Sequence, residues 1–186
     1  DYDTYLLKMV DIYMEAIIGT GEEHIKHIAR KVIEQKGDRV YTFTRERIKW
    51  HKEQGHIVIA ISGSPLELVK EMSEKYHMDD YRGTIYKLDE NGKYNGEVVP
   101  MWDSDSKQKA INELVEKHDI DLSKSYAYGD TSGDYTMFKS VGCPFAINPT
   151  KELLGKIKND ESLKDKINLI VERKDVTYKL DMNSIE

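Results

Sequence analysis

The pattern of apolar and polar positions divides the chain into a helical first third and a mixed remainder. Helices are predicted over residues 4–18, 22–36 and 41–54, and Gly19-Thr20-Gly21 separates the first two. The second helix has apolar residues at the i, i+3, i+4, i+7 and i+8 spacing of an amphipathic helix, namely Ile25, Ile28, Ala29, Val32 and Ile33. The first third is therefore expected to be a cap or a flanking bundle without a strand of its own.

From residue 56 onward, short apolar runs alternate with amphipathic helices. Strands are predicted over residues 56–61, 125–129, 144–147 and 167–171, and helices over residues 65–77, 105–118, 133–140 and 150–158. Residues 83–99 alternate in polarity around Asn91-Gly92, which predicts a hairpin with a glycine-containing turn. The polar residues near the C-terminus are expected to form a tail. Such alternation of strand and helix is typical of a parallel sheet covered by helices, so the predicted fold class is α/β.

The composition excludes several classes of function. The formal net charge of −6 argues against a nucleic-acid or anionic membrane surface, because either would need a basic patch. No stretch approaches the roughly 18–20 apolar residues of a membrane span. The single cysteine, Cys143, cannot form an internal disulfide and fits a reducing, cytoplasmic compartment. The sequence indicates no oligomeric state.

Residues 125–134 contain the strongest candidate chemistry. Asp130 follows the end of a predicted strand, and Asp134 lies four residues later. Thr131 is predicted to be a helix N-cap, with Asp134 completing a capping box on the face that packs inward. The two carboxylates would converge at the C-terminal end of a strand, where open α/β sheets bind ligands, and oxygen-only ligands suit Mg²⁺. A solvated turn with an acidic cap is an equally open reading of this segment alone.

A second candidate site follows the strand predicted over residues 56–61. Ser62 closes that strand, Ser64 is predicted to be the N-cap of the next helix, and Glu67 is predicted to complete a capping box. Backbone amides at a helix N-terminus and a hydroxyl can together bind an anion, and Gly63 would let the backbone approach it. A well-capped helix without a ligand is the alternative.

Helical periodicity separates two lysines of the helix predicted over residues 105–118. Lys107 lies four residues before Ile111, on the apolar stripe, and it is expected to point inward from the first turn. Lys109 lies on the opposite, polar face and is expected to be solvated. An inward lysine costs stability unless it meets an anion, so Lys107 is the candidate for binding a phosphate or a carboxylate.

Together these segments resemble motifs II, III and IV of the haloacid dehalogenase-like superfamily: Ser62-Gly63-Ser64, then Lys107, then Gly129 to Asp134. Residues 91–96 and 146–149 resemble those of the branch that includes phosphoserine phosphatases, and the resemblance covers roughly residues 50–150. It implies a Rossmann-like, three-layer αβα core with a parallel sheet. In this reading, residues 1–50 are part of a helical cap, residues 51–175 are the core, and residues 176–186 are a C-terminal tail.

The resemblance also implies an activity: Mg²⁺-dependent phosphomonoester hydrolysis through an aspartyl-phosphate. The substrate would be a small phosphorylated metabolite, phosphoserine-like compounds included. Ser62, Lys107, Asp130 and Asp134 would be the catalytic residues, with Ser62, Gly63, Ser64 and Lys107 on the phosphate and Asp130 and Asp134 at the Mg²⁺ ion. Asp134 would reach either the water bound to the metal or the lysine.

Two departures from the family pattern affect this reading. The Asp-x-Asp-Gly-Thr nucleophile motif is missing: Asp1-Tyr2-Asp3-Thr4 imitates it, but the glycine is absent and no apolar strand precedes it. The nucleophile and its strand are expected upstream of Asp1, so the chain alone is expected to be inactive. Gly133 stands where phosphoserine-type enzymes have Asn, which weakens the case for phosphoserine itself.

Two further functions stay open at this point. One is a phosphotransferase of the same superfamily, which would pass the phosphoryl group to an acceptor other than water. The other is a catalytically inactive regulatory module that binds phosphate or Mg²⁺. An Asp-x-Asp on an upstream strand would exclude the module, and phosphate release measured with and without added alcohols would separate the transferase from the hydrolase.

Overall fold

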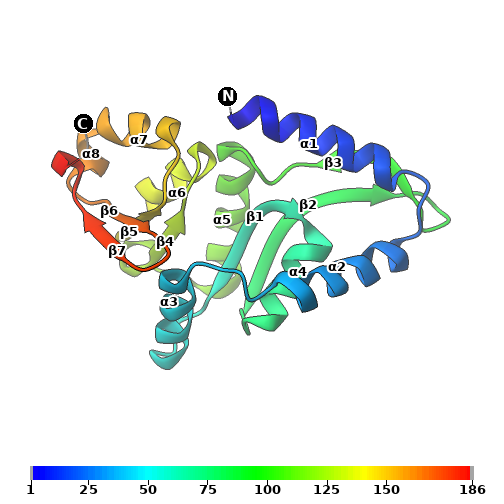
Figure 1. The fold of residues 1–186 in the computed structure, drawn as a ribbon, viewed down its shortest axis with the longest axis horizontal. Coiled ribbons are helices and arrows are strands. Elements are labelled where there is room, and N and C mark those ends of the chain that lie inside the picture. Colours follow the sequence, from blue (N-terminus) through cyan, green and yellow to red (C-terminus); the bar gives the residue numbers. More distant parts are fainter. Residues whose placement is uncertain (1, 185–186) are drawn as a thin grey trace. The chain divides into compact units, whose positions relative to one another are not determined.

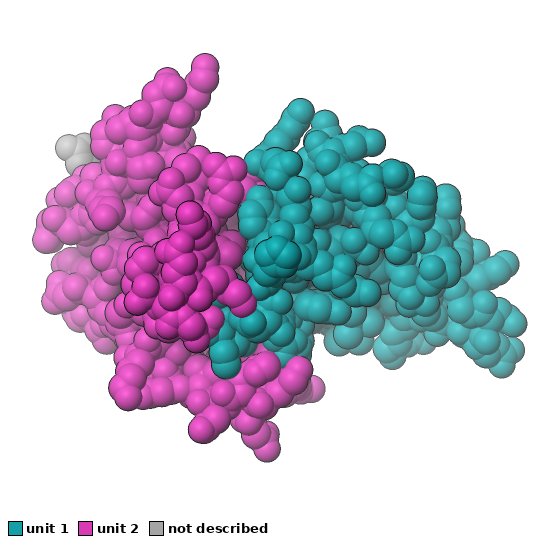
Figure 2. Space-filling model, turned by 90° about the horizontal axis from the view of Figure 1, so that it is seen from below, with its two compact units in different colours: residues 1–39, 57–101 teal, residues 40–56, 102–186 magenta. Residues whose placement is uncertain are grey.

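The computed structural model describes residues 2–184, with side chains from residue 4 onward. Figure 1 shows its helices and strands, and Figure 2 shows that it divides into two compact units, residues 1–39 with 57–101 and residues 40–56 with 102–186. The boundary predicted after residue 50 separates a cap from a core, and the one predicted after residue 175 separates the core from a tail. Both are functional divisions and stay predictions. No described helix is long and apolar enough to cross a bilayer.

The first unit contains a three-stranded sheet with three helices. Its sheet has the order β1-β2-β3, in which β1 and β2 are parallel and β2 and β3 antiparallel. In chain order the elements are α1 (Tyr2–Ile17), α2 (Glu22–Lys36), β1 (Ile59–Pro65), α4 (Leu66–Lys75), β2 (Asp80–Leu88) and β3 (Tyr94–Val99). The two predicted helices and the hairpin are thereby confirmed. Asp1 lies outside the described residues, and the rest of the Asp1-Tyr2-Asp3-Thr4 segment begins α1, not a strand.

Helix α2 buries a narrower face than its apolar stripe predicts. Ile25 and Ala29 are buried, whereas Ile28 and Val32 are 43% and 39% exposed. The turn before α2 is fixed by the hairpin, because the backbone N–H of Gly19 donates to the carbonyl of Tyr94. Gly19 has a φ of +75°, a left-handed conformation that glycine adopts without strain.

The strand predicted over residues 56–61 begins and ends later in the structure, as β1. It includes the serines that the sequence placed at a helix start, and Pro65, not Ser64, is the N-cap residue of α4, without a side-chain cap. Pairing with β2 explains the correction, since the Thr84 hydroxyl donates to the Gly63 carbonyl at 2.8 Å. Gly83 allows this close packing, because a Cβ there would lie 2.8 Å from the Cα of Leu66.

The second unit contains a four-stranded sheet of order β4-β5-β6-β7, parallel except for its last pair. Its helices are α3 (Thr42–Glu53), α5 (Ser104–His118), α6 (Tyr135–Ser140), α7 (Lys151–Lys158) and α8 (Glu161–Lys164). Its strands are β4 (Tyr126–Gly129), β5 (Cys143–Ile147), β6 (Asn168–Glu172) and β7 (Thr177–Leu180). Short 3₁₀ turns are η1 (Leu122–Lys124), η2 (Ser132–Asp134) and η3 (Met182–Ser184).

Strand β7 lies in the polar stretch for which the sequence predicted only a tail. It pairs antiparallel with β6, with Leu180 opposite Leu169, and Leu180 packs against the core. The rest of β7 is exposed. A four-residue strand with one apolar anchor has too little periodicity to be recognised from sequence.

The second unit has three layers, because side chains on β4 and β5 alternate between the two faces of the sheet and helices cover both faces. Ala127 and Ala146 point into the buried cluster on one face, where they meet Phe138, Leu153 and Ile157 of the helices that follow. On the other face, Tyr126, Tyr128 and Phe145 contact α3. This helix–sheet–helix arrangement confirms the predicted α/β fold.

Two glycine-to-alanine substitutions are expected to change the stability of the second unit in opposite directions. A Cβ at Gly142 would lie 1.9 Å from the carbonyl oxygen of Ser123, so Gly142→Ala should lower the free energy of unfolding by about 1–3 kcal/mol. Gly155 lies in α7 with open space around it, so Gly155→Ala should raise it by up to about 1 kcal/mol. Urea unfolding measures both, and a neutral Gly142→Ala would contradict the packing described.

Candidate active site

A buried ion pair joins α5 to the turn after β4. The ammonium of Lys107 lies 2.5 Å from Oδ1 of Asp134, and the two residues are 6% and 4% exposed. The predicted inward direction of Lys107 is therefore confirmed, and Lys109 is exposed as predicted. Because the pair is removed from water, each charge depends on the other for compensation.

The second oxygen of Asp134 is also fully engaged. Oδ2 accepts hydrogen bonds from the backbone N–H groups of Asp130 (3.0 Å) and Thr131 (3.1 Å) and from the Thr131 hydroxyl (3.3 Å). Thr131 is the N-cap of η2, and Asp134 completes the predicted capping box. One carboxylate thus fixes both the direction of Lys107 and the backbone that ends β4.

Two glycines make room for this carboxylate and for the turn that contains it. A Cβ at Gly129 would lie 2.5 Å from Cγ of Asp134, and a Cβ at Gly133 would lie 2.4 Å from the carbonyl oxygen of Trp102. Both approaches are too close for any side chain. The absence of Asn at position 133 therefore has a structural cause, since the backbone of Trp102 fills the space that an Asn would need.

Asp130 extends from the end of β4 and is exposed to solvent. No other side chain in the part of the chain that the structure describes hydrogen-bonds to its carboxylate. Partial desolvation by the protein beneath it, followed by repulsion from Asp134, raises the pKa of Asp130 above its ordinary value, while Lys107 opposes the shift. A nearby cation would relieve this repulsion.

The donor set at Asp130 fits a hard cation such as Mg²⁺, which prefers carboxylate oxygens and retains several waters. Asp134 differs from Asp130, because both of its oxygens already accept hydrogen bonds from the protein and it therefore suits a positioning role. Across the described residues, no group of three or more His, Cys, Asp or Glu side chains could hold a metal. Asp130 would therefore be one carboxylate ligand among oxygens from other sources.

The structure places the predicted phosphate-binding residues in both units. Lys107, Asp130 and Asp134 lie together in the second unit, while Ser62, Gly63 and Ser64 belong to the first. There the N–H of Ser64 donates to the Ser62 hydroxyl at 3.2 Å, and all three residues are half-buried in β1. That these serines join Lys107 on one phosphate stays a prediction.

A hydrogen-bonded chain between α3 and β4 escaped the sequence analysis. Arg47 donates to the Tyr128 hydroxyl, which lies 2.9 Å from Nε2 of His51, and Nδ1 of His51 lies 2.9 Å from Nδ1 of His56. The Arg47 N–H donates to the Tyr128 oxygen, and the tautomers of His51 and His56 set the direction of the other two hydrogen bonds. Only the alternation that puts Tyr126, Tyr128 and Asp130 on one side of the strand hinted at this contact.

These hydrogen bonds fix β4 against α3 at Tyr128, two residues before Asp130. The Arg47 guanidinium lies 4.0 Å from the ring centroid of Trp50, a stacking contact that further restrains it. His51 is 8% exposed, and desolvation, then the nearby charges of Arg47 and His56, lowers its pKa to about 4. Neutral His51 is therefore the form that the fold requires.

Removal of Lys107 should destabilise the protein far more than removal of its neighbour. Lys107→Ala leaves the buried Asp134 without its cation and should lower the free energy of unfolding by about 3–5 kcal/mol. Lys109→Ala, on the exposed face of the same helix, should change it by less than about 0.5 kcal/mol. Equal losses in denaturant unfolding would contradict the geometry of the pair.

Acid should weaken the fold through His51. Its folded pKa is about 4 and its ordinary value is 6.5, so between these values the unfolded chain binds the proton more readily. Stability should be constant above pH 6.5 and fall as the pH drops towards 4, by up to about 1.4 kcal/mol per pH unit. The test compares wild type, His51→Gln and the control His24→Gln, which alters an exposed histidine. Only His51→Gln should flatten this slope, and an unchanged slope would refute the assignment.

Comparison with known proteins supports the family resemblance that the sequence motifs predict. A protein from Streptomyces azureus called inhibition of morphological differentiation protein is 31% identical over 143 residues, which are 76% of this chain and 52% of that protein. A phosphoserine phosphatase from Methanocaldococcus jannaschii is 26% identical over 132 residues, 70% of this chain and 57% of that protein. The chain thus spans about half the length of these curated relatives.

The fold has solved counterparts as well. A protein of unknown function from Bordetella pertussis Tohama I superposes with a TM-score of 0.69 at 14% identity, over 81% of this chain and 70% of that one. A sequence model described as haloacid dehalogenase-like hydrolase matches residues 4–139. The match includes the Lys107–Asp134 pair, Asp130 and the glycine turn between them. The chain belongs to the haloacid dehalogenase-like hydrolase family.

Proposed function

We propose that this chain forms the phosphate- and Mg²⁺-binding part of a phosphomonoester hydrolase that acts through an aspartyl-phosphate. The observation that carries the proposal is the buried Lys107–Asp134 pair beside Asp130 at the C-terminal end of a parallel strand. The relative named phosphoserine phosphatase supports the reaction class. The substrate would be a small phosphorylated metabolite, and the single cysteine favours a cytoplasmic enzyme.

In this proposal Lys107 binds the phosphoryl group. A lysine ammonium has three donors, and Asp134 accepts one of them, which leaves the others for phosphoryl oxygens. The capped turn holds Asp134, so the direction of the ammonium is fixed before substrate binds. Such preorganised charge is what phosphoryl transfer requires of a protein.

Asp130 would bind the Mg²⁺ ion, and Asp134 would act through Lys107. Mg²⁺, when bound, neutralises negative charge on the phosphate and so lets a carboxylate approach it. The raised pKa of Asp130, caused first by desolvation and then by Asp134, is consistent with a carboxylate positioned for a cation. Ser62, Gly63 and Ser64 would bind the remaining phosphoryl oxygens.

The attacking carboxylate would lie on a strand next to β4. No residue in the described chain is assigned this role. Strand β4 pairs only with β5 among the described residues, so no strand is paired to its other edge there. A parallel strand at that edge would end beside Asp130, because parallel strands bring their C-terminal ends to the same side of a sheet.

Asp130→Asn should abolish Mg²⁺-dependent phosphate release by the natural full-length protein, with a loss of at least about 100-fold. The substitution also removes a charge that repels Asp134, so the fold should persist. Asp175→Asn, on an exposed loop, is the matched control and should retain activity. Titration of this chain with Mn²⁺, observed by electron paramagnetic resonance, should show weaker binding for Asp130→Asn, and wild-type turnover by that variant would refute the metal assignment.

A further inference from the structure

Glu67 of α4 has one buried carboxylate oxygen without a partner. Its Oε1 accepts a hydrogen bond from the Tyr94 hydroxyl at 2.8 Å, whereas Oε2 is buried and bonds to nothing. No lysine, arginine or histidine of the described chain makes an ion pair with it. The capping role predicted for Glu67 is not observed, because its side chain points away from the start of α4 and towards the hairpin.

Neither protonation state of Glu67 satisfies this oxygen. An ionised Oε2 lacks a donor, and a protonated Oε2 lacks an acceptor. An unpaired buried polar atom costs about 1–3 kcal/mol, and such atoms are rare in native proteins unless a ligand or water completes them. The surroundings of Glu67 should therefore show what the missing donor is.

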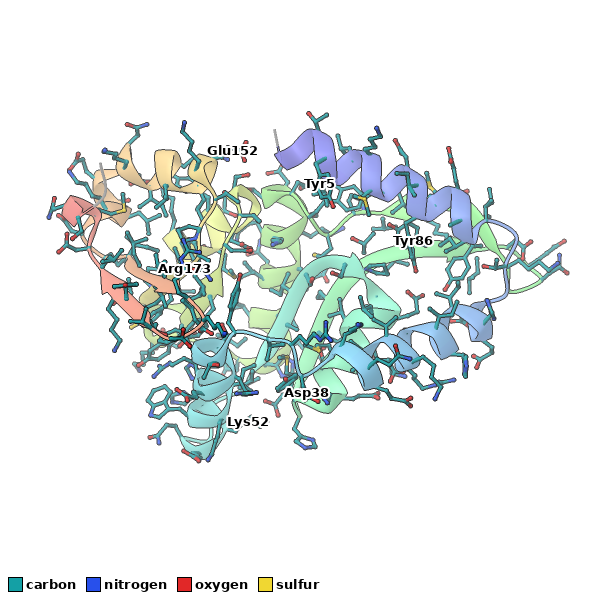
Figure 3. All side chains as sticks on the ribbon, in the orientation of Figure 1. Tyr5, Asp38, Lys52, Tyr86, Glu152 and Arg173 are labelled. Atoms are coloured by element: carbon teal, nitrogen blue, oxygen red, sulfur yellow. The ribbon has the colours of Figure 1, made fainter. Side chains whose placement is uncertain are left out.

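Three tyrosines from three elements pack together near the carboxylate, and Tyr94 hydrogen-bonds to it. Tyr13 of α1 and Tyr86 of β2 have ring centroids 4.9 Å apart at 60°, and Figure 3 shows Tyr86 on the side of β2 that α1 covers. Tyr86 and Tyr94 are 6% and 2% exposed. Burial first, and then the charge of Glu67, raises the pKa of Tyr13 to about 12, so its phenol stays neutral at physiological pH.

We propose that Glu67, with Tyr13, Tyr86 and Tyr94, forms a binding site for an organic ammonium group. The ammonium would donate a charge-assisted hydrogen bond to Oε2, and such bonds are roughly twice as strong as neutral ones. The aromatic rings would attract the same cation through their negative faces. A carboxylate beside buried rings, which makes no ion pair among the described residues, complements a positively charged ligand.

Two sources could supply this ammonium: the leaving group of a phosphorylated substrate or a free amine. Glu67 lies three residues after Ser64 in the same unit, so it is close along the chain to the proposed phosphate-binding residues. The ammonium site is independent of the proposed function, because it rests on the unpaired oxygen and the tyrosines and requires no catalysis.

The experiment titrates this chain with ethanolamine and with ethylene glycol, its neutral counterpart of similar size, by NMR. Ethanolamine should bind, ethylene glycol should not, and Glu67→Gln should weaken ethanolamine binding at least tenfold. Glu71→Gln removes the same charge one turn further along α4 and should leave binding unchanged. The NMR spectrum of Glu67→Gln, compared with that of the wild type, shows whether the variant is folded.

Three results would overturn the site: equal binding of both probes, retained binding in Glu67→Gln, or no binding of ethanolamine by the folded wild type. O-phosphoethanolamine separates the two sources. Tighter binding than ethanolamine assigns the site to substrate, and equal binding assigns it to a free amine; both outcomes support an ammonium site. Failure of Asp130→Asn to affect turnover would leave this measurement unaffected.

Discussion

The buried pair of Lys107 and Asp134 is the constraint on which the rest of the site depends. Two charges withdrawn from water stabilise a fold only when their hydrogen bonds are complete and their geometry is good. The bonds are complete on the carboxylate, whose oxygens accept from one ammonium, two backbone amides and one hydroxyl. The turn after β4 and the first turn of α5 are therefore a single electrostatic unit, and Asp130 projects from it.

The carboxylates of Asp134 and Glu67 differ in a way that bears on function. Asp134 accepts hydrogen bonds on both oxygens from donors within the protein, and so it positions Lys107 and the turn after β4. Glu67 has a donor on one oxygen only. A carboxylate whose oxygens all accept hydrogen bonds from the protein holds its neighbours in place. A carboxylate with an unpaired oxygen can still accept a hydrogen bond from a ligand.

The parts of the site that sequence predicts are those set by local periodicity. Helical spacing put Lys107 inward and Lys109 outward, and the strand–turn–helix pattern put Asp130 and Asp134 together. The errors come from contacts between distant segments. Pairing with β2 extends β1 through Ser62 and Ser64, and no local pattern shows that Thr84 and Gly83 make this possible.

The remaining omissions have the same physical origin. His51 meets Tyr128 across 77 residues of sequence, and Glu67 meets tyrosines from three separate elements, so neither environment can be read from neighbouring residues. Strand β7 was missed for another reason: four residues with one buried anchor carry almost no periodic signal. Local pattern determines which way a side chain points, and tertiary packing determines what it meets.

The close approach of Gly133 to the Trp102 carbonyl links the turn after β4 to the start of α5. Any residue larger than glycine at position 133 would displace the peptide that leads into α5, and Lys107 lies in the first turn of that helix. The direction of the Lys107 ammonium therefore depends on a position that has no side chain.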